Sequence, residues 1–133
     1  MNEEPGKRVG DVMSRNIKTI DRMATVADAI QMMDQASVSS LIVERRDPSD
    51  EYGLLVITDI AREVVATNRA ADRVNVYEIM SKPVLTLPED MKVRYAVRLL
   101  VRFELSRALV VDKEREPVGI VTLREMVLRH APG

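Results

Sequence analysis

Cysteine and tryptophan are both absent from this sequence of 133 residues, and it has one histidine and 3% aromatic residues. The lack of cysteine excludes disulfides and thiolate chemistry and fits a reducing cytoplasm. A lone histidine, His130, argues against a histidine general base or a multi-histidine metal site. So few aromatic residues also argue against the stacking platforms that bind single-stranded nucleic acid.

Long apolar runs are missing as well. No stretch approaches the roughly 20 apolar residues of a membrane span, and the N-terminal MNEEPGKR has no apolar signal segment. The 20 basic and 21 acidic side chains leave a net charge of -1, which argues against nucleic acid or an anionic membrane as a partner. There is no phosphate-binding glycine loop and no recognisable catalytic constellation. We expect a soluble cytoplasmic protein that is not an enzyme and holds no metal.

An internal repeat organises the chain, whose 46% hydrophobic content suffices for a core. A shift of 67 positions aligns identical residues in the two halves. The aligned pairs include Val9 with Val76, Met13 with Met80, Ser14 with Ser81, Ala29 with Ala96, and Ser39 with Ser106. We place the repeats at residues 8–67 and 76–131, joined by a polar linker at 68–75.

Each repeat is expected to run β-α-β-β-α. Apolar residues at helical spacing predict one amphipathic helix per repeat, and β-branched runs bounded by Pro, Asp and Gly predict the strands. The expected strands are 17–20, 41–44, 54–57, 84–87, 108–111 and 118–121, and the expected helices are 25–36, 60–67, 91–104 and 123–130. The fold class is therefore α/β, in two repeats that are each too small to be stable alone.

This double plan, opened by DVMS and EIMSKP and closed by GLLVITDI and GIVTLREM, resembles a tandem pair of CBS domains, the family named after cystathionine β-synthase. The resemblance covers nearly the whole chain. It implies two repeats packed with pseudo-twofold symmetry, with adenosine-containing ligands such as AMP, ADP, ATP or S-adenosylmethionine in the clefts between them. It also implies a homodimer with a regulatory role.

The closing motif of the family has a Thr or Ser after two apolar residues and an Asp at the start of the last helix. The resemblance implies that this carboxylate accepts hydrogen bonds from both ribose hydroxyls, because an ionised carboxylate has several acceptor sites. The first repeat keeps the acid as Asp59, preceded by Thr58, but has Val56 at the earlier hydroxyl position. The second keeps Thr122 but has Glu125 at the acid position and Arg124 before it. Each site thus departs from the pattern.

Three further positions follow from the resemblance. Arg107, whose counterpart is Ser40, falls where the family often has a basic residue for phosphate, and we expect it to serve the ligand held by Asp59. Ile17 and Val84 begin the first strands, where the family frames adenine.

Simpler roles remain open for the same residues. Thr122 and Glu125 form the sequence of a capping box, and Thr58 with Asp59 suits an N-cap followed by a first-turn acid. Arg107 suits a solvated cation at a strand end. Arg94, Arg98 and Arg102, spaced by four, suit either the water-facing side of a helix or a surface for an acidic partner.

Two functions follow from these features. One is a regulatory module that binds an adenosine-containing ligand and signals to a separate effector protein. The other is a dimerisation or protein-interaction module whose nucleotide sites have decayed, as Val56 and Glu125 would suggest.

Overall fold

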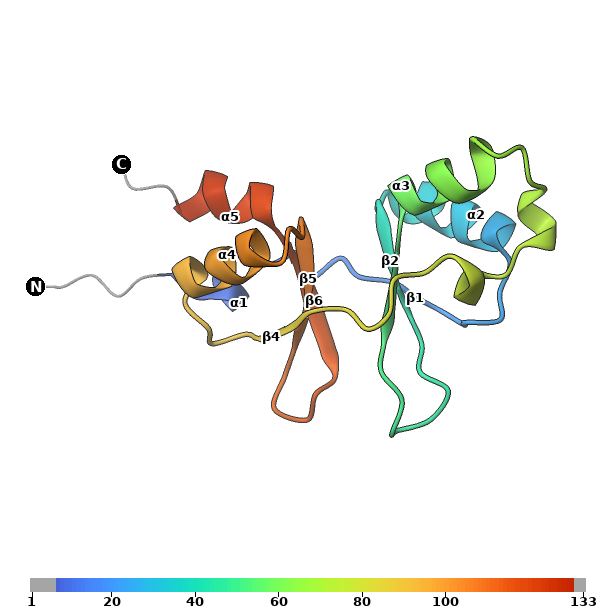
Figure 1. Cartoon of the computed structure of the whole chain (residues 1–133). Coiled ribbons are helices and arrows are strands. Elements are labelled where there is room, and N and C mark those ends of the chain that lie inside the picture. Colours follow the sequence, from blue (N-terminus) through green and yellow to red (C-terminus); the bar gives the residue numbers. More distant parts are fainter. Residues whose placement is uncertain (1–6, 131–133) are drawn as a thin grey trace, which may run out of the picture. The chain divides into compact units, whose positions relative to one another are not determined.

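The computed structural model describes residues 7–130 and divides into two compact units, each treated by itself below (Figure 1). The first-repeat unit comprises Ile17–Val84. Within the described residues, the second-repeat unit comprises 85–130 together with the N-terminal segment 7–16. Residue 131, where the sequence places the end of the second repeat, and the side chain of His130 lie outside the described part.

The first-repeat unit is a three-stranded sheet with helices packed against it. Strand β1 pairs in parallel with β2, and β2 pairs antiparallel with β3. Helix α2 connects β1 to β2, and α3 follows β3 directly and continues as a π-helical turn. The bounds are β1 Thr19–Ile20, α2 Val26–Ala36, β2 Ser40–Val43, β3 Gly53–Val56, α3 Ile57–Ile60 and the π-helical turn Ala61–Val65, followed by 3-10 turns at Ala71–Arg73 and Val76–Glu78.

Helix α2 begins at a complete capping box. The Thr25 hydroxyl accepts the Asp28 backbone N–H at 3.1 Å, and the Asp28 carboxylate accepts the Thr25 backbone N–H at 3.1 Å. These two bonds satisfy backbone donors that the first turn leaves without helical partners. The local sequence therefore determines where α2 starts.

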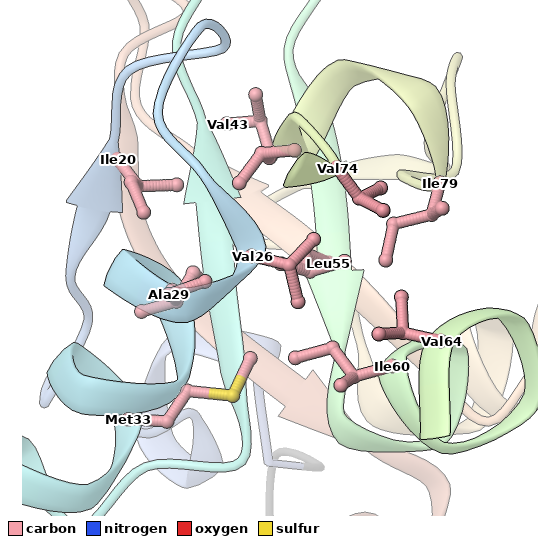
Figure 2. Packing of buried hydrophobic residues seen from close by; sticks show 12 residues of the cluster. Ile20, Val26, Ala29, Met33, Val43, Leu55, Ile60, Val64, Val74 and Ile79 are labelled. Atoms are coloured by element: carbon pink, nitrogen blue, oxygen red, sulfur yellow. The ribbon is translucent and has the colours of Figure 1, made fainter. Parts of the chain in front are cut away.

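The core of the first-repeat unit lies between α2, one face of the sheet and the helix after β3. Figure 2 shows side chains from α2, the sheet and the later turns converging in one cluster. Its buried members are Ile20, Val26, Ala29, Met33, Leu41, Val43, Leu55, Ile60, Val64, Val74, Val76 and Ile79. Val74 comes from the segment expected to be a polar linker, and the Val26 N–H donates to the Val74 carbonyl at 2.8 Å. That segment therefore takes part in the core of this unit.

The second-repeat unit repeats the plan, and in Figure 1 its helices lie together on one side of its sheet. Strands β4, β5 and β6 pair in that order, with β4 parallel and β6 antiparallel to β5. The bounds are α1 Val9–Val12, β4 Thr86–Pro88, α4 Val93–Arg102, β5 Arg107–Val111, β6 Pro117–Thr122 and α5 Leu123–His130. The short helix α1 comes from the N-terminal segment, and both its valines are buried in the core of this unit.

The Met-Ser pair that opens each repeat pairs with the last strand of the other repeat. Ser81 and Leu54 exchange backbone hydrogen bonds of 2.8 and 2.9 Å, and Ser14 and Ile120 exchange bonds of 2.9 and 3.0 Å. Each unit therefore combines strands of one repeat with the opening segment of the other.

The expected pair of β-α-β-β-α repeats is confirmed, and α5 has the predicted bounds. One boundary was wrong in a way that matters for the site. The sequence predicts the helix after β3 from residue 60, whereas α3 begins at Ile57 with Val56 as its N-cap. Thr58 is therefore not the N-cap.

Among residues 7–130, no helix combines the length and the apolar character that a membrane span requires.

Candidate functional site

Asp59 is the buried carboxylate at the strand-to-helix junction of the first-repeat unit. It stands at the third position of α3, and the residue is only 5% exposed. Its Oδ2 accepts the Val56 backbone N–H at 3.0 Å, and its Oδ1 accepts Nη2 of Arg62 at 2.8 Å. An aspartate is rarely so buried without hydrogen-bonding partners. The Val56 N–H and the Arg62 guanidinium are those partners for Asp59. The first bond also explains why α3 starts early, because Asp59 satisfies a backbone donor at its first turn.

Arg62 is the exposed partner of this carboxylate. Its side chain is 62% exposed, against 8% for that of Asp59. The hydrogen bond from its Nε to Glu63 Oε2, at 3.1 Å, and the bond to Asp59 raise the pKa of the Arg62 guanidinium above its ordinary value. A solvated guanidinium can exchange one partner for another at little cost. The contact that holds Asp59 is therefore replaceable by other donors.

The other candidate residues of the first-repeat unit, Thr58, Ile17 and Val84, differ in exposure. Thr58 is exposed in the first turn of α3. Ile17 is half-buried and lines a hollow of about 670 Å³ whose other lining residues are Lys18, Thr19, Met32, Gln35 and Ala36. Asp59 is not among the residues that line this hollow. Val84 is half-buried at the end of the unit. Both Ile17 and Val84 precede the strands that they were expected to begin.

In the second-repeat unit, Arg107 and Thr122 are cross-strand partners. They pair at one end of the β5–β6 ladder, and both are half-buried. Paired residues on neighbouring antiparallel strands project from the same face of a sheet. The same register pairs Ser40 with Val56 in the first-repeat unit. At these equivalent positions the second-repeat unit therefore has an arginine beside a threonine, whereas the first-repeat unit has a serine beside a valine.

Thr122 also caps α5, as one of its two expected roles predicts. Its Oγ1 accepts the Glu125 backbone N–H at 3.0 Å. The Glu125 carboxylate instead contacts Arg129, whose Nε donates to Oε1 at 2.9 Å. Arg124 is exposed and lies 3.7 Å from Glu125 Oε2. Two guanidinium groups therefore face the acid that stands at the family's ribose-binding position.

The structure thus brings six of the eight candidate residues together in two sets, one in each unit, and Ile17 and Val84 belong to neither set. Thr58 and Asp59 share a helical turn, and Arg107, Thr122, Arg124 and Glu125 gather where β6 meets α5. The expected joint action of Asp59 and Arg107 on one ligand stays a prediction, because they belong to different units.

Arg62 and Arg129 are the residues that sequence reasoning missed. Each lies three or four positions after the acid that it contacts, a spacing that brings side chains together on a helix. This spacing of acid and arginine was visible in the sequence.

Within residues 7–130, no group of three or more His, Cys, Asp or Glu side chains is placed to hold a metal ion.

Comparisons with known proteins agree with the duplicated plan. The family model described as the CBS domain matches this chain twice, over residues 9–66 and 76–130. An uncharacterized protein of Methanopyrus kandleri is 29% identical over 119 residues, which cover 90% of this chain and 60% of that protein. The chain therefore spans less than two thirds of the length of this relative.

Two solved structures are similar to it in fold. The hexameric CBS-CP12 protein from bloom-forming cyanobacteria is 33% identical, with a TM-score of 0.87 over 94% of this chain and 68% of that one. A CBS domain pair solved in complex with 5′-methylthioadenosine and S-adenosyl-L-methionine is 25% identical, with a TM-score of 0.77 over 94% and 96% of the two chains.

Proposed function

The chain belongs to the CBS domain family, and from that membership we propose that it is a regulatory module that binds an adenosine-containing ligand through Asp59. The ligand class comprises AMP, ADP, ATP and S-adenosylmethionine. The ribose hydroxyls donate to the Asp59 carboxylate, and the bound state is passed to a separate effector protein.

The observation that carries this proposal is the buried Asp59 carboxylate, held on one oxygen by an exposed arginine (2.8 Å). A vicinal diol offers two donors, and an ionised carboxylate has about four acceptor sites. Hydroxyl donors can therefore take the place of Arg62 without leaving the carboxylate unsatisfied. Arg62, once released, is a cation beside the ribose that suits a phosphate or a carboxylate of the same ligand.

The structural comparison supports the ligand class. The CBS pair solved with 5′-methylthioadenosine and S-adenosyl-L-methionine matches 94% of this chain, and both of those ligands contain adenosine. The preference between a nucleotide and S-adenosylmethionine depends on the group attached to the 5′ carbon, which is anionic in the nucleotides.

Sensing requires that the ligand favour one arrangement of the protein over another. The exchange at Asp59 supplies such a difference, because it occurs where β3 passes into α3 and the following π-helical turn. Single π-helical turns inside helices often accompany functional sites. A change in the partner of Arg62 therefore acts directly on the helix that follows.

Isothermal titration of AMP, ADP, ATP and S-adenosylmethionine into the protein tests this function. We expect at least one of them to bind, and we expect Asp59→Ala and the more isosteric Asp59→Asn to weaken its binding. Asp72→Ala is the matched control, because it removes an exposed carboxylate of the same unit. Circular dichroism checks that each variant is folded. The absence of binding by all four at millimolar concentration would contradict the proposal.

The second candidate is an interaction module with decayed nucleotide sites. The observation that favours it is that both acids at the family's ribose-binding position already have protein partners, Arg62 for Asp59 and Arg129 for Glu125. The same titration separates the candidates, because a decayed site would bind none of the four ligands.

A further inference from the structure

Arg22 and Tyr77 form a stacked pair in the first-repeat unit. The guanidinium carbon of Arg22 lies 5.2 Å from the centroid of the Tyr77 ring, and the Tyr77 N–H donates to the Arg22 carbonyl at 3.1 Å. Met23 lies beside them in the sequence, and its carbonyl accepts Nδ2 of Asn75 at 2.8 Å. Tyr77 is 40% exposed and Met23 is 55% exposed. These three side chains, Arg22, Met23 and Tyr77, are named the Arg22 surface below.

The Arg22 guanidinium lacks an anionic partner. Among residues 7–130 it forms no salt bridge, and its Nε is buried without an acceptor. Its Nη1 contacts Met23 Sδ at 3.6 Å, and a thioether sulfur is only a weak acceptor. The neighbouring acid, Asp21, accepts the Met23 backbone N–H at 2.7 Å instead. Because a guanidinium has five N–H donors, Arg22 keeps most of its capacity to bind a carboxylate.

The equivalent positions of the second-repeat unit have the opposite character. The shift of 67 positions matches Arg22 with Glu89, Met23 with Asp90, and Tyr77 with Gly10. The main chain is nevertheless the same, because the Gly10 N–H donates to the Glu89 carbonyl at 2.8 Å, as Tyr77 does to Arg22. The fold therefore forms this turn without an arginine, a methionine or a tyrosine. The Arg22 surface is a feature of one repeat and not a requirement of the fold.

The Arg22 surface is also separate from Asp59. Strand β1 ends at Ile20, which pairs with the last residue of β2, whereas Val56, which precedes α3, pairs with the first residue of β2. The turn that carries Arg22 and the helix that carries Asp59 therefore adjoin opposite ends of β2. The surface is distinct from the ribose site proposed above.

We propose that the Arg22 surface binds an acidic segment of another protein, in which a carboxylate lies beside an apolar side chain. The carboxylate accepts from the Arg22 guanidinium, and the apolar side chain packs on Met23 and Tyr77. Tyr and Arg dominate the binding energy of protein interfaces, and Met is enriched there. The stack on Tyr77 restricts the guanidinium before binding, which reduces the entropy lost on association. This proposal goes beyond nucleotide binding and does not depend on it.

Selection of phage-displayed random peptides on the full wild-type chain tests the proposal. We expect the enriched peptides to have Asp or Glu next to an apolar residue. Synthetic copies should bind about tenfold more weakly to Arg22→Glu and to Tyr77→Ala, as is typical of residues that dominate an interface. Lys113→Glu makes the same change of charge at an exposed loop position of the other unit, and should bind as wild type does. Circular dichroism checks that each variant is folded.

A change in the peptide provides an arm that leaves the protein unaltered. Replacing the selected Asp or Glu by its amide should weaken binding to wild type about as much as Arg22→Glu does. The same replacement should have little effect on binding to Arg22→Glu, because the two changes remove one interaction. Undiminished binding of the amide peptide by wild type would overturn the proposal. Enrichment of peptides without acids, or of no peptide at all, would overturn it as well.

A second copy of this chain is the other occupant to be distinguished, since Glu89 and Asp90 could supply the acids. Sedimentation velocity of wild type and Arg22→Glu without peptide should show equal self-association. Weaker association of Arg22→Glu would assign the surface to a contact between copies and overturn the proposal. Titration of the four adenosine-containing ligands into Arg22→Glu should match wild type. A failure of peptide binding is thereby distinguished from a failure of the proposed nucleotide binding.

Discussion

At the scale of single residues, two buried glycines show how closely the chain packs where each Met-Ser pair meets a strand. A Cβ on Gly119 would lie 2.5 Å from Met13 Sδ and 2.8 Å from the Ser14 carbonyl oxygen. A Cβ on Gly53 would lie 2.6 Å from Met80 Sδ but 3.3 Å from the Ser81 carbonyl oxygen. A methionine end can move aside, whereas a hydrogen-bonded backbone cannot do so cheaply.

We therefore expect Gly119→Ala to be more damaging than Gly53→Ala. Overpacking of this kind typically lowers the free energy of unfolding by about 1–3 kcal/mol, and Gly119→Ala should lie toward the upper end of that range. Chemical denaturation of the two variants measures the difference. Equal effects would mean that the methionine, and not the backbone carbonyl, determines the requirement for glycine.

Asp50 provides a prediction about acid stability. Its side chain is 7% exposed, and its carboxylate accepts the Arg46 backbone N–H at 2.9 Å and contacts Lys82 Nζ at 2.7 Å. These two donors hold the pKa of Asp50 well below its ordinary value of 3.8. A lowered folded-state pKa stabilises the fold above the unfolded-state pKa, and this stabilisation is lost as the pH falls below it.

Asp50→Asn should accordingly lower the melting temperature at neutral pH and reduce its decline between about pH 5 and pH 2, the window set by a carboxylate of lowered pKa. Thermal melts of wild type and variant across that range measure both effects. Glu51→Gln, an exposed neighbour, is the control. Parallel declines in wild type and Asp50→Asn would contradict the assignment.

At the scale of elements, the cap of α5 lies within the candidate site of the second-repeat unit. Thr122→Ala removes the acceptor for the Glu125 N–H (3.0 Å) and should lower the free energy of unfolding by about 1 kcal/mol. Thr122→Ser keeps the hydroxyl and should retain most of that stability. If both variants are equally destabilised, the contribution of Thr122 comes from its methyl group in β6 and not from the cap.

Periodicity predicted the helices with a strong apolar stripe, α2 and α4, to within two residues at each end. It failed for α3, because Val56 cannot cap a helix with its side chain and Asp59 accepts the free backbone N–H three residues later. Helix α1 was missed because Val9–Val12 forms only four residues of helix, too few for any period to be visible.

At the scale of the whole molecule, the sequence predicted two repeats, but the compact units do not coincide with them. Val9 and Val12 precede the first repeat's strands, yet they belong to the core of the second-repeat unit. A repeat pattern shows which residues are equivalent and does not show which strands a flanking segment joins. That choice depends on tertiary contacts such as the pairing of Ser14 with Ile120.

The candidate site could be predicted from the sequence only in part. The family resemblance identified Asp59, and the structure adds that it is buried and held by Arg62. Its burial could not be read from sequence, because a first-turn acid is exposed in most helices and is buried here by the packing of α3 on its sheet.

The most direct test of the central claim is a comparison of ribose with deoxyribose at Asp59. The tightest-binding of the four ligands and its 2′-deoxyadenosine counterpart would each be titrated into wild type and Asp59→Asn. We predict that wild type loses about tenfold or more in affinity for the deoxy ligand, as expected for a hydrogen bond to a charged group. Asp59→Asn should discriminate far less. Equal binding of both ligands by wild type, or an undiminished preference in Asp59→Asn, would contradict the claim that Asp59 holds the ribose.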